Sequence, residues 1–213
     1  PADRPPVEGV RPGDGAREAR SPSALAPLSA IAFKVVADPG AGAVTWLRLY
    51  SGTLRSGSVV LSARTGRRER IGRLFQLHGK EREELSVALA GDIVAVLGLR
   101  DVRSGDTLAD PAAPIALESL TVPDPVIAVA LVPKGAADRE RLGPALARLA
   151  LEDPSLRLAT DGETGDVVAL GMGELHLDVV VEKLRRAGVE VRALEPSVAY
   201  RETVRGVARV DHK

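Results

Sequence analysis

The sequence contains no cysteine and no asparagine, and aromatic residues make up only 2% of it. The absence of cysteine excludes disulfide bonds, cysteine nucleophiles and thiolate metal sites. With so few aromatic side chains, the core has to be built from valine, leucine, isoleucine and alanine. No apolar run of about 18 residues occurs, so we expect no membrane-spanning helix. The residues after Pro1 do not resemble a secretory leader, and we expect a cytoplasmic protein that does not contact membranes.

Charge of neither sign predominates. The 29 lysine and arginine residues balance the 29 aspartate and glutamate residues, which gives a formal net charge of zero. A protein that binds duplex DNA by itself usually carries a strongly basic surface, so we expect no binding to DNA. The hydrophobic fraction of 45% and the charged fraction of 27% are typical of a folded globular chain.

Residues 1–27 hold few large apolar side chains and many Pro, Gly, Arg and Asp residues. Such a segment buries too little apolar surface to offset the chain entropy that ordering would cost. We therefore interpret residues 1–27 as a linker or tail.

Short β-rich segments separated by glycine-bearing turns follow from Leu28 onward, and no helical stripe lies among them. This spacing predicts an all-β barrel or sandwich over residues 28–119. The strands expected here span residues 28–37, 44–50, 58–63, 70–77 and 92–99.

Helical periodicity first appears in the last part of the chain, where we expect a domain over residues 120–203. Its expected elements are a strand at 126–132, a helix at 136–152, strands at 156–160 and 166–170, a helix at 172–186 and a strand at 189–193. The order β-α-β-β-α-β predicts a ferredoxin-like domain. Pro144 falls inside the first helix, where proline removes a hydrogen bond, so we expect a break near Gly143 and Pro144.

Several motifs give the chain a family resemblance. Residues 171–184 read GMGELHLDVVVEKL, residues 152–155 read EDPS, and residues 50–57 read YSGTLRSG. In these motifs the chain resembles domains II and III of elongation factor G. The resemblance implies a translation-factor-type β-barrel followed by a ferredoxin-like domain. It also implies that residues 1–27 lead from a missing GTPase domain and that residues 204–213 begin the passage to a missing domain IV.

Nucleotide-binding motifs are absent from the sequence. A P-loop needs the pattern G-x-x-x-x-G-K-[ST], whose backbone amides and lysine hold phosphates, and no segment fits it. The guanine-reading N-K-x-D motif requires asparagine, which the chain lacks. We therefore expect no catalytic, cofactor-binding or metal-binding residues in this fragment. The resemblance assigns GTP and magnesium to the full-length parent, which it predicts to be a GTPase.

Arginine residues in the barrel are candidates for contact with ribosomal RNA, because the resembling domain II docks on the small ribosomal subunit. Arginine forms bidentate hydrogen bonds with phosphate, which suits it to this role. The candidates near barrel turns and around Gly66 are Arg55, Arg64, Arg67, Arg68 and Arg103. The alternative is an arginine-rich, solvated hairpin that nearby glutamates balance. Base-specific reading of RNA is not expected, since aromatic stacking partners are nearly absent.

The GMGELHLD helix of the resembling family faces the GTPase domain across a cleft that binds fusidic acid. The matching positions imply that the domain III side of this cleft is lined by Asp153, Ser155, His176, Val180 and Lys183. The alternative is that these are ordinary helix-surface and turn residues. His176 has no neighbouring nucleophile or second ligand in the sequence, so catalysis or metal binding by it is not expected. Gly171 and Gly173 are better explained by tight strand-to-helix packing than by phosphate binding.

The function predicted from this resemblance is to dock on the ribosome and transmit the nucleotide switch of a factor that promotes translocation of tRNA and mRNA. The expected partners are the RNA and proteins of the small ribosomal subunit, and the GTPase and tip domains of the same parent chain. The fragment itself is expected to be monomeric and without catalysis. Two alternatives stay open, namely a paralogue that acts in ribosome recycling or protection, and a self-contained RNA-binding module.

Overall fold

The structure is a computed structural model that describes residues 4–38, 42–78, 81–118, 122–162, 164–196, 206 and 210. The chain forms two compact units and first passes from one to the other between Asp124 and Pro125. The predicted boundary at residues 119–120 and most of the predicted passage at residues 204–213 lie outside the described residues. Neither helix of the described chain is long and apolar enough to cross a membrane.

The strands of the first unit are mostly short. They are β1 (Val7–Val10), β2 (Arg17–Arg20), β3 (Ser29–Asp38), β4 (Gly42–Ser51), β5 (Thr53–Arg55), β6 (Val59–Ser62), β7 (Arg68–Arg70), β8 (Leu74–His78), β9 (Glu81–Leu85), β10 (Val87–Leu89), β11 (Ile93–Leu97), β12 (Thr107–Ala109) and β13 (Ala116–Leu117). Eight of them form one antiparallel sheet in the order β7-β6-β12-β3-β4-β11-β8-β9, and β10 pairs with β5.

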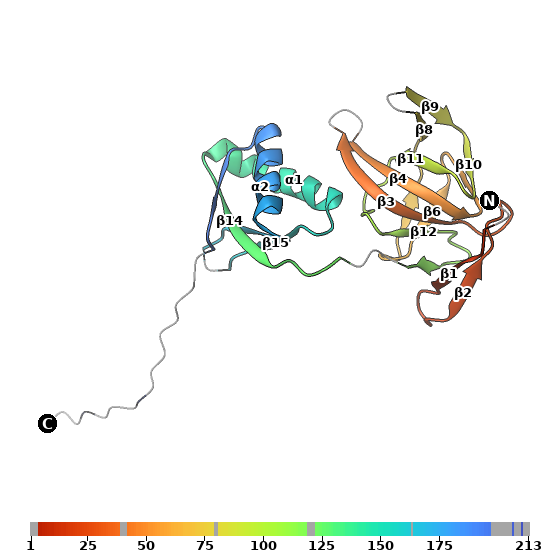
Figure 1. Cartoon of the computed structure of the whole chain (residues 1–213), viewed down its shortest axis with the longest axis horizontal. Coiled ribbons are helices and arrows are strands. Elements are labelled where there is room, and N and C mark those ends of the chain that lie inside the picture. The colour runs from red at the N-terminus through yellow and green to blue at the C-terminus, as the bar shows by residue number, and fades with distance from the viewer. Residues whose placement is uncertain are drawn as a thin grey trace. The chain divides into compact units, whose positions relative to one another are not determined.

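This sheet curls into a barrel (Figure 1), and the segment that joins β7 to β8 closes it. The two strands lie near opposite ends of the strand order, yet only residues 71–73 separate them in the chain. The Gly72 amide donates to the Leu97 carbonyl at 2.9 Å, and the Leu97 amide donates to the Arg73 carbonyl at 3.0 Å. Because this segment continues directly from β7 at one end of the sheet and pairs with β11 near the other end, the sheet has to curl around its apolar face.

Aliphatic side chains fill the barrel, as the scarcity of aromatic residues predicted. The fully buried members include Leu47, Leu54, Ile71, Leu74 and Leu108. They come from strands far apart in the sequence, so their burial depends on closure of the sheet. This hydrophobic contact stabilises the barrel as one cooperative unit.

The interpretation of residues 1–27 as a linker is wrong for β1 and β2. These strands form a hairpin, and β1 also pairs with β13, with Gly9 opposite Leu117. The sequence signal was weak because the hairpin is held mainly by polar groups. The guanidinium of Arg20 is buried, where it contacts Glu18 at 2.7 Å and donates to the Ala113 carbonyl at 3.0 Å.

The last part of the chain forms the predicted ferredoxin-like domain. Its elements are β14 (Ile127–Pro133), α1 (Ala136–Glu152), β15 (Arg157–Thr160), β16 (Val167–Gly171), α2 (Glu174–Arg186) and β17 (Val191–Leu194). The four strands form an antiparallel sheet in the order β15-β16-β14-β17. Helix α2 lies against β16 and β17 and buries Leu177, Val180 and Leu184. The predicted fold class, a β-barrel followed by a ferredoxin-like domain, is therefore confirmed.

The expected break in the first helix is absent, because α1 runs continuously from Ala136 to Glu152 with Pro144 inside it. Proline removes one backbone donor from the helix, which is a local loss. Leu142 and Leu146, on either side of it, are both buried. Their burial favours the helical conformation on both sides of the proline and outweighs the missing bond.

Candidate functional site

Arg64, one of the RNA-contact candidates, is engaged within the barrel. Its Nε donates to Asp106 Oδ1 at 2.8 Å, and its Nη2 donates to the carbonyl and Oδ1 of Asp101 at 3.0 and 3.2 Å. Asp106 is buried, and the hydrogen bond to it raises the pKa of the Arg64 guanidinium. Asp106 Oδ2 also accepts the Arg103 backbone amide at 3.0 Å. Arg64 therefore links the β6–β7 turn to the loop before β12.

The other four arginine candidates are exposed. Arg67 Nη1 lies 3.9 Å from Asp101 Oδ2, a weak contact for a side chain that is 76% exposed. Arg68 lies on β7, Arg103 begins the turn that Asp106 closes, and Arg55 ends β5. The fold thus brings Arg64, Arg67 and Arg103 to the Asp101–Asp106 loop. Whether any of these arginines contacts RNA stays a prediction.

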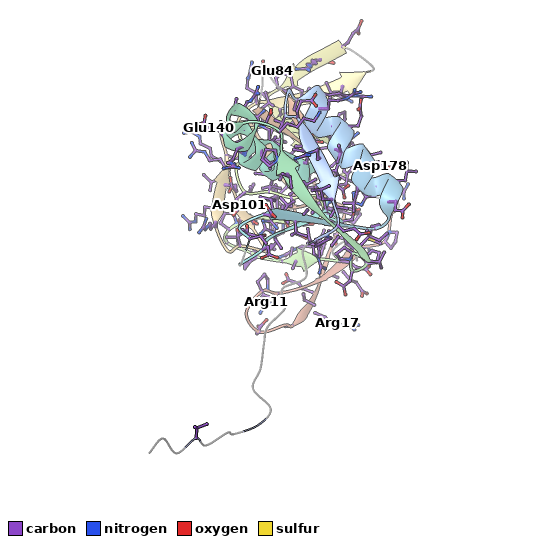
Figure 2. All side chains as sticks on the ribbon, turned by 90° about the vertical axis from the view of Figure 1, so that its left-hand side faces the viewer. Arg11, Arg17, Glu84, Asp101, Glu140 and Asp178 are labelled. Carbon is purple, nitrogen blue, oxygen red and sulfur yellow. The ribbon has the colours of Figure 1, made fainter. Side chains whose placement is uncertain are left out.

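A hollow of the first unit lies between the β1–β2 hairpin and the barrel. It is lined by side chains of both charges, among them Glu8, Arg17, Arg64 and Asp106. Figure 2 shows Arg11 and Arg17 on this hairpin, and Glu84 at the opposite end of the unit. Thr107 supplies the hydroxyl in the lining, but its Oγ1 accepts the Leu117 amide at 3.1 Å. With its oxygen held in a structural hydrogen bond, Thr107 is not placed as a nucleophile.

Asp153 and Ser155 form a local turn directly after α1. Asp153 Oδ1 accepts hydrogen bonds from both the backbone amide and the hydroxyl of Ser155, the first at 2.9 Å. The Asp153 amide in turn donates to the Leu149 carbonyl at 2.9 Å, at the end of the helix. These bonds give both residues a structural role, because they fix the direction in which the chain leaves α1.

His176 ties the start of α2 to the preceding strand. Its Nδ1 accepts the Met172 backbone amide at 3.0 Å, which places the ring proton of the neutral imidazole on Nε2. The N-cap residue Gly173 offers no side-chain hydrogen bond of its own. A Cβ at Gly171 would lie 2.9 Å from His176 Nδ1 and 2.8 Å from a methyl group of Leu177. Tight packing therefore explains Gly171, as predicted.

The packing interpretation is wrong for Gly173, because a Cβ there would meet no atom within 4 Å and its φ of 169° is ordinary extended backbone. Val180 is 3% exposed and belongs to the apolar face of α2, so in this structure it is not available to line a cleft. Lys183 is exposed, one helical turn further along. Assignment of the five residues to a fusidic acid cleft stays a prediction, and Val180 fits it least.

Groups suited to chemistry do not gather in the described part of the chain. No three His, Asp or Glu side chains of the described residues are placed to hold a metal ion. The pKa of Arg64 is raised by its hydrogen bond to the buried Asp106, whereas the other described groups with shifted pKa values, Asp14, Glu182 and Arg185, lie at the surface. Hydrogen bonds from Arg185 and then Arg186 lower the pKa of Glu182, for example, at the exposed end of α2.

Comparison with known proteins identifies the two units. A family model described as elongation factor G domain 2 matches residues 27–111, and one described as elongation factor G, domain III, matches residues 122–195. The chain belongs to the elongation factor G family. It comprises domains II and III of that family, and is thus part of a translation elongation factor-like protein.

A solved structure extends this comparison. The crystal structure of a protein from Thermus thermophilus is similar to this chain, with a TM-score of 0.70 and 39% sequence identity. The match covers 81% of this chain and 26% of the Thermus protein, so the chain spans about a quarter of the length of that relative. Most of this chain therefore shares its fold with a solved structure.

We predict that His176→Ala destabilises the elongation factor G domain III unit by about 1 kcal/mol, because it leaves the partly buried Met172 amide without this acceptor. Urea unfolding followed by circular dichroism would measure the change. Asp178→Ala is the control, since Asp178 is exposed on the same helix (Figure 2) and its removal should change stability by less than about 0.5 kcal/mol. Equal effects of both variants would show that the His176 bond contributes nothing.

Proposed function

We propose that this chain is the central part of a GTP-dependent elongation factor that promotes movement of tRNA and mRNA on the ribosome in the cytoplasm. The observation that carries the proposal is the match to two elongation factor G domains, in consecutive order, over residues 27–111 and 122–195. In this role the chain itself performs no catalysis. The barrel docks on the small ribosomal subunit, and the ferredoxin-like domain connects it to the GTPase domain and the tip domains.

GTP and magnesium belong, in this proposal, to a GTPase domain outside the chain. This assignment is supported by the sequence, which contains neither a P-loop pattern nor any asparagine for the guanine-reading motif. Calorimetric titration of the chain with GDP and with GTP and magnesium should therefore show no binding. Binding of either nucleotide with micromolar affinity would contradict the assignment of nucleotide binding to a GTPase domain outside the chain.

Exposed arginines of the barrel are the proposed docking contacts. Arg55, Arg68 and Arg103 have exposed side chains, whereas the guanidinium of Arg64 is held by Asp106 and Asp101. Phosphate contacts add affinity that falls with salt concentration, because each one releases condensed counterions. Docking through these arginines should therefore weaken as salt is raised, and weaken less steeply once they are removed.

The test is binding of the chain to isolated small ribosomal subunits, measured by co-sedimentation over a series of salt concentrations. Simultaneous replacement of Arg55, Arg68 and Arg103 with alanine should weaken binding about tenfold or more and reduce the salt dependence. Arg139→Ala, an exposed arginine on α1, is the control and should leave binding unchanged. Failure of the unaltered chain to bind would contradict docking, and full binding by the triple variant would exclude these three contacts.

A further inference from the structure

Three aromatic side chains of the barrel gather on one outer face, although aromatic residues are scarce in the sequence. Both phenylalanines and the only tryptophan, Phe33, Phe75 and Trp46, lie on strands β3, β8 and β4. The ring centroids of Phe33 and Trp46 are 6.5 Å apart, with the rings tilted by 51°. Phe33 is 41% exposed, a high value for a large apolar side chain. The amino-acid composition alone does not show that these three rings lie together.

The sheet register explains how the rings come together. Trp46 and Phe75 are both cross-strand partners of Ala95, whose small side chain is buried between them. The β3–β4 ladder shifts register between Ala32 and Lys34, so that the consecutive residues Phe33 and Lys34 are both exposed. A β-bulge has this effect because it inserts one extra residue into one strand.

The result is an apolar groove across β3, β4, β11 and β8, lined by Trp46, Phe75 and Ala95 and bordered by Lys34 and Arg82. Its volume of about 190 Å³ is smaller than the roughly 300–1,000 Å³ of pockets that enclose whole small molecules. The groove therefore suits one planar group of a larger partner rather than an enclosed cofactor.

Positive charge surrounds this groove. The Arg73 guanidinium carbon lies 5.4 Å from the centroid of the Phe75 ring, Lys34 is exposed beside Trp46, and Arg82 is paired with Leu77 across the β8–β9 ladder. Glu84, the cross-strand partner of Phe75, is an acidic side chain in the same row. Cations on several sides of partly exposed rings favour a polyanion that carries flat aromatic groups.

We propose that this aromatic groove binds single-stranded RNA, with an unpaired base stacked on Trp46 or Phe75 and the flanking phosphates contacting Lys34, Arg73 and Arg82. Stacking of bases on exposed rings beside basic side chains is the usual way in which proteins hold single strands without reading their sequence. The proposal deepens the proposed docking, and rests on it for the identity of the RNA as ribosomal. We expect a modest affinity, with a dissociation constant of about 10⁻⁴ to 10⁻⁵ M at physiological salt, which is within the range typical of sequence-independent binding through phosphate contacts.

Trp46 makes this proposal directly measurable, because the chain has no other tryptophan. Titration with oligoadenylate RNA of about ten nucleotides should quench the Trp46 fluorescence to saturation, and raising the salt concentration should weaken the binding. A blunt RNA duplex of the same length should quench far less, since its bases are already stacked. An acidic polyglutamate peptide tests whether the face is instead a protein-docking surface.

Phe75→Leu keeps an apolar side chain but removes the ring, and should weaken binding of the oligonucleotide about tenfold. Lys34→Ala, at an exposed position, should weaken binding several-fold and reduce its salt dependence. Leu175→Ala is the control, since Leu175 is 77% exposed on α2 in the other unit. Circular dichroism checks that each variant is folded, and Lys34→Ala still tests the groove if Phe75→Leu does not fold.

RNA binding at the groove is supported if single-stranded RNA quenches Trp46 fluorescence and both variants weaken this binding. The proposal is overturned if the oligonucleotide leaves Trp46 fluorescence unchanged, if the variants bind like the unaltered chain, or if polyglutamate quenches as strongly as RNA. These outcomes are separate from ribosome docking. If the chain binds small subunits but RNA does not quench Trp46 fluorescence, ribosome docking is supported and RNA binding at the groove is contradicted. If RNA quenches Trp46 fluorescence but the chain does not bind small subunits, RNA binding at the groove is supported and ribosome docking is contradicted.

Discussion

Gly72→Ala should destabilise the barrel by about 3 kcal/mol. A Cβ added at Gly72 would lie 2.3 Å from the Leu97 carbonyl oxygen, which real Cβ atoms essentially never approach so closely. That oxygen also accepts the Gly72 amide at 2.9 Å, in the pairing that closes the sheet. The obstacle is backbone rather than a flexible side chain, so the β7–β8 segment and β11 have to separate to make room.

Urea unfolding monitored by Trp46 fluorescence measures this effect in the barrel alone, because the only tryptophan lies on β4. Gly66→Asn provides the matched control. Gly66 has a φ of +67°, which asparagine tolerates, and no atom lies within 4 Å of an added Cβ. The control should cost less than about 1 kcal/mol. Similar unfolding midpoints for the two variants would show that the β7–β8 segment does not hold the barrel closed.

The ferredoxin-like domain could be predicted almost completely from the sequence. Its first helix has the predicted bounds, residues 136–152, because leucine spacing and flanking Pro and Gly residues are local signals. The barrel was predicted less well. Strands such as β5, β7, β12 and β13 have only two or three residues, which is too short to show a periodicity. They form because partners distant in the chain pair with them.

The N-terminal hairpin illustrates the same limit. Its strands read VEGV and REAR, and neither holds enough apolar side chains to predict a strand. Pairing of β1 with β13 supplies hydrogen bonds that only the folded barrel can provide. Arg20, which reads as a solvated charge in the sequence, is buried against a carbonyl group of the loop before β13.

Functional residues were harder to predict than the fold, because their roles depend on neighbours in space. The sequence placed Arg64 in a basic cluster around Gly66, but pairing of β6 with β12 brings Asp106 next to it. The scarcity of aromatic residues argued against base-specific reading of RNA. Sheet register instead brings the rings of β3, β4 and β8 to one face. Composition reports how many such side chains exist, and only the fold shows where they meet.

The ion pair between Arg64 and Asp106 leads to the second large expected effect. Asp106→Ala should destabilise the barrel by about 2–3 kcal/mol. The Asp106 carboxylate is 6% exposed and accepts both the Arg64 Nε and the Arg103 amide, so its removal leaves two donors without this partner. The loss is smaller than for a fully buried pair, because the Arg64 side chain is 38% exposed and water can solvate it.

A double-mutant cycle separates this structural role from a role in RNA contact. Arg64→Ala, Asp106→Ala and the double variant should show a coupling energy of about 1 kcal/mol or more in urea unfolding followed by Trp46 fluorescence. Arg67→Ala is the matched control, since its guanidinium lies 3.9 Å from Asp101 and its side chain is 76% exposed. It should leave the unfolding midpoint unchanged within about 0.5 kcal/mol.

The same variants then show what Arg64 does on the ribosome. Loss of subunit binding by Arg64→Ala is a docking effect only if Asp106→Ala, which disturbs the same loop without removing a cation, binds normally. If both variants bind weakly in proportion to their lost stability, Arg64 acts by holding the β6–β7 turn to the loop before β12. Additive effects of the two substitutions on stability would contradict the ion pair as a stabilising contact. Arg64 would then again be a candidate for contact with RNA phosphates.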